Sequence, residues 1–178
     1  VIDSEITIIA TGFAPDISIA ENSGIKCNTR GITTDTFLRT SVQNVFAAGD
    51  CIESWSSIDG KQLSSRLATS AYKQGTIAGI NALGGATEYR GTASTFVTRV
   101  GNFEIAGTGF NTETAIERGF EPVSGKIMSK VRPEYYPDNA DITVKIIFDR
   151  NSGLILGAQC AGSEGAASPR PPLAEGLG

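Results

Sequence analysis

The hydrophobic and polar positions change period several times along the chain, which divides it into strand-like and helix-like segments. Residues 6–10 form a β-branched run that ends at Thr11-Gly12, and residues 45–48 form an apolar run that ends at Gly49-Asp50. Both runs have the length and the flanking residues of buried strands that enter loops. Between them, residues 24–35 alternate apolar and polar side chains among glycines, which predicts a hairpin or two edge strands.

Helical spacing follows a polar loop at 53–62, whose Ser, Asp and Gly residues favour turns over any regular element. From Leu67 onward, small and apolar residues recur every three or four positions, and Gly84-Gly85 ends the pattern. We expect one helix over about 65–83, with a serine at its start as the N-cap.

The second half of the chain returns to short strands. Runs at 94–100 and 103–108 flank Gly101-Asn102, as in a hairpin. A short capped helix is expected after them, and then three more strands, so the predicted segments are 111–119, 121–129, 142–148 and 154–161. Together they predict an antiparallel sheet with a helix beside it.

Composition divides the chain at the same places. We expect a first domain at 1–88, a second at 89–165, and a tail at 166–178 that is rich in Gly, Ala and Pro. Because three prolines interrupt that tail, we expect it to be disordered or extended.

Charge and residue usage exclude several classes of protein. The chain has 15 basic and 19 acidic residues without a block of like charge, which argues against nucleic acid as a partner. It has no apolar stretch of membrane-spanning length and no signal-peptide pattern, so we expect a cytoplasmic protein without a membrane partner. Three separated cysteines and no histidine predict no disulfide framework, no metal site and no His-based triad.

The run that ends at Gly49-Asp50 is the first candidate for chemistry. In an open parallel sheet the ligand lies beyond the carboxyl ends of the strands, where Asp50 would accept hydrogen bonds, for instance from a polyol. Gly49 would let that group approach the backbone. The same run fits a core strand whose Asp50 caps a turn about as well. The start of the next helix, Arg66 to Thr69, offers free N–H groups, although many helices begin this way without a ligand.

Several ordered motifs carry a family resemblance. The stretches IIATGFAPD, GITTDTFLRTSVQNVFAAGDC and SRLATSAYKQGTIAGINALGG closely resemble the C-terminal part of the FAD-binding domain of pyridine nucleotide-disulfide oxidoreductases. The stretches TRVGNFEIAGTGFN, PEYYPDNADITVKIIFD and GLILGAQCAGSEGA are similar to the dimerisation domain of that family. Within the family, the chain is most similar to the NADH oxidase and coenzyme A-disulfide reductase branch.

The resemblance implies a fold of two parts: an α/β remnant of a Rossmann-like FAD-binding domain, and then an α+β dimerisation domain built on an antiparallel sheet. Asp50 would accept a hydrogen bond from an FAD ribityl hydroxyl, with Gly49 leaving room for that chain. The start of the long helix would meet the pyrimidine edge of the flavin, where its dipole stabilises negative charge. The implied cofactor-binding residues are Thr40, Gly49, Asp50, Leu67, Ala68 and Thr69.

Two tyrosines are implied to act in catalysis. Tyr135 and Tyr136 align with a segment that, in the coenzyme A-disulfide branch, reaches across a homodimer toward the partner's active site. A buried phenol there could donate a proton or orient a thiolate. An aromatic pair that only fills the dimer interface is an equally good interpretation.

The family motifs that are missing from the chain indicate which part of the enzyme it represents. It contains neither the glycine-rich fingerprint for FAD, nor the redox-active cysteine near it, nor the second fingerprint for NAD(P)H. We therefore expect the C-terminal part of an FAD-dependent NAD(P)H oxidoreductase that is inactive by itself. The parent reaction would pass a hydride from NAD(P)H to FAD and then electrons to oxygen, a disulfide or a related acceptor. The alternative is a non-catalytic dimerisation module with no cofactor bound.

Overall fold

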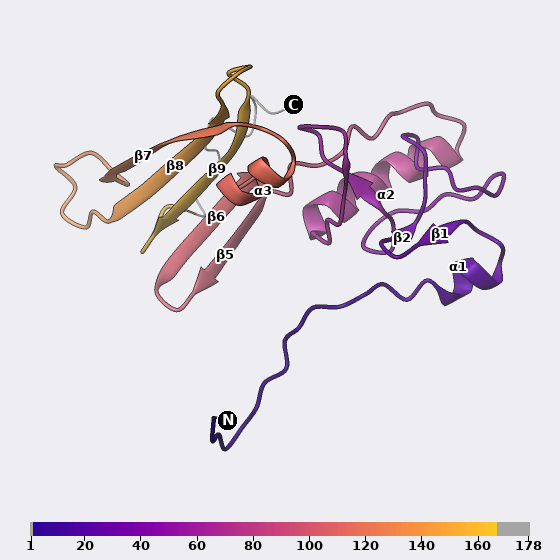
Figure 1. The fold of residues 1–178 in the computed structure, drawn as a ribbon, viewed down its shortest axis with the longest axis horizontal. Coiled ribbons are helices and arrows are strands. Elements are labelled where there is room, and N and C mark those ends of the chain that lie inside the picture. Colours follow the sequence, from indigo (N-terminus) through magenta and orange to yellow (C-terminus); the bar gives the residue numbers. More distant parts are fainter. Residues whose placement is uncertain (1, 167–178) are drawn as a thin grey trace.

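The computed structural model describes residues 2–166 and shows two parts joined by a linker, with an extended segment at the N-terminus (Figure 1). The described elements, in chain order, are α1 (Ser18–Asn22), β1 (Cys27–Asn28), β2 (Gly31–Ile32), β3 (Ser54–Trp55), β4 (Gln62–Leu63), α2 (Ala68–Ala82), β5 (Phe96–Val100), β6 (Phe103–Gly109), α3 (Thr112–Glu117), β7 (Pro122–Lys130), β8 (Asp141–Asp149) and β9 (Ile155–Gly162). The tail expected at 166–178 lies outside the described residues, apart from Ala166.

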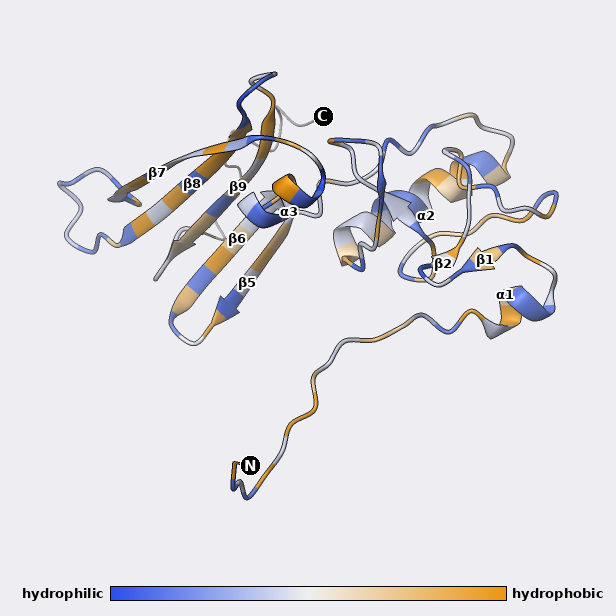
Figure 2. Ribbon diagram, in the orientation of Figure 1, coloured by the Kyte–Doolittle hydropathy of each residue, from blue (hydrophilic) through white to orange (hydrophobic). Residues whose placement is uncertain are grey.

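The second part is a five-stranded antiparallel sheet in the order β5-β6-β9-β8-β7. Every strand expected there is present, and Figure 2 shows apolar and polar residues alternating along β6 and β8. The register places one residue of each strand side by side in a wholly apolar row: Val97, Ala106, Cys160, Val144 and Ile127. Because side chains alternate between faces, this row lies on a single face of the sheet.

Helix α3 covers the other face at one end of the sheet. Its N-cap is Asn111, as the sequence predicts, and the side-chain oxygen of Asn111 accepts from the Thr114 N–H at 2.7 Å. Ala115 of α3 packs in a buried cluster with Ile147 of β8, and Lys145 of β8 donates to the Thr112 hydroxyl at 2.8 Å. Along β8, Val144 of the apolar row alternates with Lys145 and Ile147, so the row lies on the opposite face of the sheet from these two residues. Helix α3 therefore leaves the face of the apolar row uncovered.

The first part is built around α2. Its core comprises Leu38, Ile52, Ile77, Ala78 and Tyr89. The helix ends at Ala82 and is followed by Gly84 with a φ of +92°, which confirms the predicted stop. Its start differs from the prediction, because Leu67 is the N-cap and no side chain caps the first turn. The expected serine cap is wrong: the Ser65 hydroxyl instead shares a 3.3 Å hydrogen bond with the Ser70 hydroxyl.

Two strands predicted in this part do not form. Residues 6–10 are extended but unpaired, and Ile6, Ile8 and Ile9 are each at least 80% exposed. A strand needs a neighbour for its N–H and C=O groups, and residues 2–166 supply none here. Residues 45–48 form only an isolated bridge, between Arg39 and Phe46. The side chains of Phe46, Ala47 and Ala48 still pack, half-buried, on the core of the first part.

Two hairpins complete the first part. Strands β1 and β2 pair as the expected hairpin. Strands β3 and β4 also pair, although the polar composition of 53–62 predicted only turns. No helix within residues 2–166 combines the length and the apolarity needed to cross a bilayer.

Candidate functional site

A buried glutamine holds the Gly49-Asp50 turn against α2. The Gly49 N–H donates to Oε1 of Gln74 at 2.8 Å, and Gln74 is 1% exposed. Gly49 has a φ of +90°, and a Cβ added there would lie 3.9 Å from the Cβ of Ala71. Glycine adopts this left-handed backbone without the strain that a side chain would add. The turn therefore presents the exposed Asp50 beside the N-terminal half of α2.

The first turn of α2 is open to a ligand. Its N-cap residue Leu67 has an extended backbone, no side chain caps the turn, and no acidic residue lies in it. Ala68 and Thr69 are exposed. Uncapped N–H groups and the positive end of the helix dipole favour electron-rich or anionic atoms at such a place.

Thr40 uses its hydroxyl within its own loop. The hydroxyl lies 3.3 Å from the Val42 carbonyl oxygen and accepts from the Val42 N–H at 3.2 Å, while the Thr40 N–H donates to the Val45 carbonyl at 2.9 Å. These bonds shape the 40–45 loop that leads to the Gly49-Asp50 turn. Thr40 would therefore affect a ligand beside the Gly49-Asp50 turn in two ways, through its hydroxyl and through the shape that it gives to the 40–45 loop.

The structure adds Arg66, which the sequence reasoning named only as part of a helix start. Its guanidinium donates to the Phe13 carbonyl and lies 4.7 Å from the centroid of the Phe13 ring. Arg66 thus ties the segment after Thr11-Gly12 to the start of α2. The Nε of Arg66 is buried and has no hydrogen-bond partner among residues 2–166. A sequence pattern could not reveal this contact, because Phe13 lies 53 residues away.

A hollow of about 510 Å³ is bordered by the N-terminal part of α2. Thr69, Ser70 and Lys73 of α2 line it together with Arg90 and other residues of the linker that leads to the sheet. None of its described lining residues is acidic, and Lys73 and Arg90 form no ion pair in residues 2–166. The hollow adds positive charge near the open first turn.

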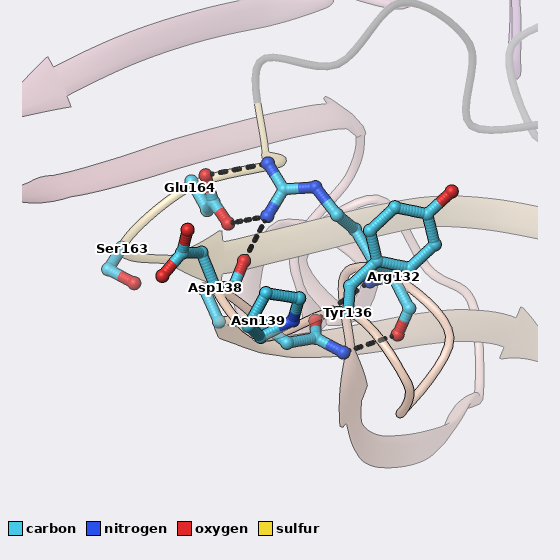
Figure 3. Close-up of a pocket in the computed structure, with 8 residues that line it drawn as sticks. Arg132, Tyr136, Asp138, Asn139, Ser163 and Glu164 are labelled. Atoms are coloured by element: carbon cyan, nitrogen blue, oxygen red, sulfur yellow. Dashed lines mark hydrogen bonds and ion pairs between the residues drawn. The ribbon is translucent and has the colours of Figure 1, made fainter.

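The two candidate tyrosines occupy the loop that joins β7 to β8. Their ring centroids are 4.9 Å apart, with Tyr135 80% exposed and Tyr136 47% exposed. Only Tyr136 lines the neighbouring pocket of about 660 Å³, together with Arg132, Asn139, Ser163 and Glu164 (Figure 3). The two residues, which the sequence could not separate, therefore have different surroundings.

An ion pair connects this loop to the end of β9. Arg132 donates to both oxygens of Glu164, at 2.5 and 3.0 Å, and to the Asp138 carbonyl at 2.5 Å. The hydrogen bond from Arg132 is the main reason that the pKa of Glu164 lies below its ordinary value, and the same bond raises the pKa of Arg132. The sequence analysis singled out neither residue: Arg132 lies just before the quoted stretch PEYYPDNADITVKIIFD, and Glu164 lies within GLILGAQCAGSEGA without a role of its own.

Within one chain the structure does not bring the tyrosines to the Asp50 turn. The β7–β8 loop lies at the far end of the molecule from α2 (Figure 1). Of the candidate flavin-binding residues, Gly49 and Asp50 lie on a turn held against α2, whose first turn follows Leu67 and begins with Ala68 and Thr69, while Thr40 bonds within its own loop. No group of three or more His, Cys, Asp or Glu side chains within residues 2–166 is placed to hold a metal ion.

Two groups beside α2 are chemically compatible with a flavin, one of them an exposed carboxylate and the other a buried donor. The Asp50 carboxylate forms no hydrogen bond or ion pair in the described part of the chain, and the buried Arg66 Nε lacks a partner. Buried polar groups in folded proteins nearly always have partners, so an orphaned donor indicates a missing one. A polyol chain beside Asp50 and a polar ring edge at the open helix turn match these groups chemically.

The chain is similar to known proteins along most of its length. Residues 1–75 match the family model of the pyridine nucleotide-disulphide oxidoreductases, and residues 95–168 match the model of their dimerisation domain. The NAD(P)H sulfur oxidoreductase (CoA-dependent) of Pyrococcus furiosus is 35% identical over 162 residues, which are 90% of this chain and 37% of that protein. The NADH oxidase of Methanocaldococcus jannaschii is 33% identical over 165 residues, or 93% of this chain and 37% of that protein.

Solved structures give the same result for the fold. An NAD-dependent persulfide reductase from A. fulgidus superimposes with a TM-score of 0.89 and 31% identity, over 94% of this chain and 32% of that one. The reduced CoADR-RHD of Bacillus anthracis superimposes with a TM-score of 0.87 and 28% identity, over 94% and 30%. The chain thus spans a little over a third of the length of the curated relatives that it matches. It belongs to the pyridine nucleotide-disulfide oxidoreductase family.

Proposed function

We propose that this chain supplies the flavin-contacting end of the FAD domain, and the dimerisation domain, of an FAD-dependent NAD(P)H oxidoreductase of the NADH oxidase or disulfide reductase type. The observation that carries the proposal is the unpartnered Asp50 carboxylate, held on the Gly49 turn beside the uncapped start of α2. The names of the relatives support the reaction class, since they include an NADH oxidase and an NAD(P)H sulfur oxidoreductase. NAD(P)H is the substrate of the whole enzyme in this proposal.

In the proposed site, each residue near α2 has a definite part in holding FAD. Asp50 accepts a hydrogen bond from a ribityl hydroxyl, and Gly49 lets the ribityl chain approach the backbone. Leu67, Ala68 and Thr69 contact the pyrimidine edge of the ring through their backbone, and the helix dipole favours negative charge there. Bound FAD supplies the chemistry of accepting a hydride from NAD(P)H and delivering electrons to the acceptor.

The tyrosine loop has its role in the partner's site. Because it lies at the far end of its own chain from α2, it can act on a flavin only across a dimer. There, the phenol of Tyr136 or Tyr135 would donate a proton to a thiolate that is released when a disulfide acceptor is reduced, or would orient that thiolate.

The open face of the sheet is the proposed homodimer interface. Its apolar row runs across all five strands, and Val97 and Ile127 at its two ends are 54% and 63% exposed. A continuous apolar stripe of this kind is unfavourable in water and favours a second protein surface. In a two-fold dimer the same row would meet its own copy.

Substitution of Asp50 tests the flavin proposal in the flavin-loaded holoenzyme. Asp50→Ala removes an acceptor of a buried hydroxyl, so the affinity for FAD should fall by about 1–3 kcal/mol, or roughly 5- to 150-fold. FAD retained after dialysis, measured by flavin absorbance, reports the change. Glu117→Ala on the exposed surface of α3 serves as the control. Equal retention by both variants would overturn the role of Asp50.

A further inference from the structure

The loop between β7 and β8 is largely exposed, but several hydrogen bonds hold its shape. Its two ends are joined by the Val131 N–H, which donates to the Ala140 carbonyl at 2.9 Å. Inside it, the side-chain oxygen of Asn139 accepts from the Arg132 N–H at 3.0 Å, and its Nδ2 donates to the Arg132 carbonyl at 2.7 Å. The Tyr136 N–H donates to the Pro133 carbonyl at 3.1 Å. These bonds shape the loop from within but do not fix it to the sheet.

The ion pair of Arg132 with Glu164 supplies that attachment. Glu164 lies two residues beyond the end of β9, so the pair links the loop to a strand that is not its neighbour in sequence. Both Glu164 oxygens accept from Arg132, and a bidentate pair fixes direction as well as distance. The Arg132 guanidinium also donates to the Asp138 carbonyl, on the other side of Tyr136. Figure 3 shows the Tyr136 ring beside the Arg132 side chain, with its hydroxyl turned away from Glu164.

The exposure of the two side chains indicates that this ion pair orients the loop rather than stabilises the fold. The side chains of Arg132 and Glu164 are 40% and 39% exposed. Ion pairs that are open to water add little to the free energy of unfolding. A bidentate contact at such a place therefore fixes the direction of the Arg132 side chain more than it stabilises the fold.

We propose that Arg132 and Glu164 are positioning residues for Tyr136, and that they hold its phenol, rather than that of Tyr135, in the orientation that reaches the partner's site. This inference rests on the proposed function, in which a tyrosine of this loop acts on a thiolate across the dimer. Tyr135 lies outside the pocket that the ion pair borders and is 80% exposed, so nothing in the described residues fixes its phenol in the same way.

The first test measures turnover in the flavin-loaded holoenzyme. Tyr136→Phe should lower kcat with a disulfide acceptor on the order of 100-fold, and Tyr135→Phe should not. Arg132→Lys keeps the charge but loses the planar fork, and Glu164→Gln loses the charge, so each should lower kcat roughly tenfold at an unchanged KM. Flavin content and flavin reduction by NAD(P)H should remain those of the unmodified enzyme.

A matched control lies on the same hairpin. Lys130 and Asp141 form an exposed 2.8 Å ion pair at the base of the loop, and neither side chain hydrogen-bonds to either tyrosine in the described residues. Asp141→Asn should therefore leave kcat unchanged. In the Tyr136→Phe background, Arg132→Lys and Glu164→Gln should cause no further loss, because the group that they position is already absent.

A second measurement does not depend on activity, so it remains informative if a variant disrupts the holoenzyme. Hydrogen exchange of the Tyr136 amide in the 178-residue chain should accelerate in Arg132→Lys and Glu164→Gln, and not in Asp141→Asn. Losses of turnover that match those of Asp141→Asn, or that add fully to Tyr136→Phe, would overturn the positioning role and leave the tyrosine role intact. No effect of Tyr136→Phe on any activity would overturn both, while the test of Asp50 would still decide the flavin proposal.

Discussion

At the scale of single residues, the local features of the site were predictable and the distant ones were not. Asp50 stands out because it ends an apolar run and follows a glycine, which are neighbours in sequence. Gln74 reads only as one more position of the helix, although its side chain holds the Gly49 turn from 25 residues away. Arg66 and Glu164 are similar cases, since their partners lie 53 and 32 residues away. Such pairings depend on the finished fold, which one sequence does not encode as a pattern.

Gln74→Leu should destabilise the chain. The leucine fills similar space but leaves the Gly49 N–H without its acceptor, and an unsatisfied buried donor costs about 1–3 kcal/mol. The free energy of unfolding from urea titrations measures this change. Gln43→Leu, at an exposed position of the 40–45 loop, is the control and should alter that free energy by less than about 0.5 kcal/mol. Equal values for the two variants would show that the bond to Gly49 is not a determinant of the fold.

The Asp149 carboxylate should make the stability of the sheet domain dependent on acid pH. It accepts from the Ser152 hydroxyl at 2.6 Å and from the Glu121 N–H at 3.1 Å, and these bonds hold its pKa below the ordinary value. Because the pKa is lowered on folding, the ionised group stabilises the fold above the unfolded pKa of about 3.9, and this contribution is lost as the pH falls from there through the folded value.

Thermal unfolding between about pH 5 and about pH 2 tests this account. Asp149→Asn should lose less Tm on acidification than the unmodified chain. Ser152→Ala removes the first of the bonds that lower the pKa, so its dependence on pH should be intermediate. Identical slopes for the three proteins would mean that other groups control acid unfolding.

At the scale of elements, the predictions succeeded where an element is stabilised by its near neighbours in sequence. Helix α2 and the strands of the second part satisfy this condition, because each strand of the hairpins β5–β6 and β7–β8 pairs with the next. The runs at 6–10 and 45–48 have strand composition but lack a ladder of partners in the described residues. The β3–β4 hairpin is the opposite case: its composition favours turns, yet its two strands pair. The hairpin also contacts the second part of the chain.

One such contact is a lock between the two parts. Arg118, at the end of α3, pairs with Asp59 of the β3–β4 hairpin at 3.1 Å and donates to the Gln62 carbonyl at 3.0 Å. The Asp59 side chain is only 5% exposed. Arg118→Met would leave that carboxylate buried without a cation beside it, with only the hydrogen bond that it accepts from the Lys61 N–H at 3.1 Å, and should cost about 3 kcal/mol in the free energy of unfolding.

The exposed pair of Arg39 and Asp35 gives the comparison for this lock. Its side chains are 56% and 47% exposed, so Arg39→Met should cost less than about 1 kcal/mol. Urea titrations of both variants provide the two values. If Arg118→Met costs no more than Arg39→Met, the hairpin is not anchored through Asp59.

At the scale of the whole molecule, the proposed roles of the two candidate sites require a second copy of the chain. The turn that carries Asp50 is held against α2, and the tyrosine loop lies at the far end of the sheet (Figure 1). The sheet between them has one face partly covered by α3 and one face with a continuous apolar row. A two-fold dimer through the open face would bury that row, and it is the arrangement in which one chain's loop could serve the other chain's site.

Adjacent residues on β7 provide the test of this interface. Ile127 lies in the apolar row and is 63% exposed, whereas Met128 is 71% exposed on the face that carries Lys145 and α3. Ile127→Lys would bury a charge in the proposed dimer, which should bury about 1,200–2,000 Å² in total, and should therefore yield monomers in sedimentation equilibrium at micromolar concentration. Met128→Lys adds the same charge one residue away and should leave the dimer intact, because side chains alternate across the sheet. If Met128→Lys yields monomers and Ile127→Lys does not, the chains meet through the face that carries α3. An unmodified chain that is monomeric under these conditions would remove the route by which the tyrosine loop reaches a flavin.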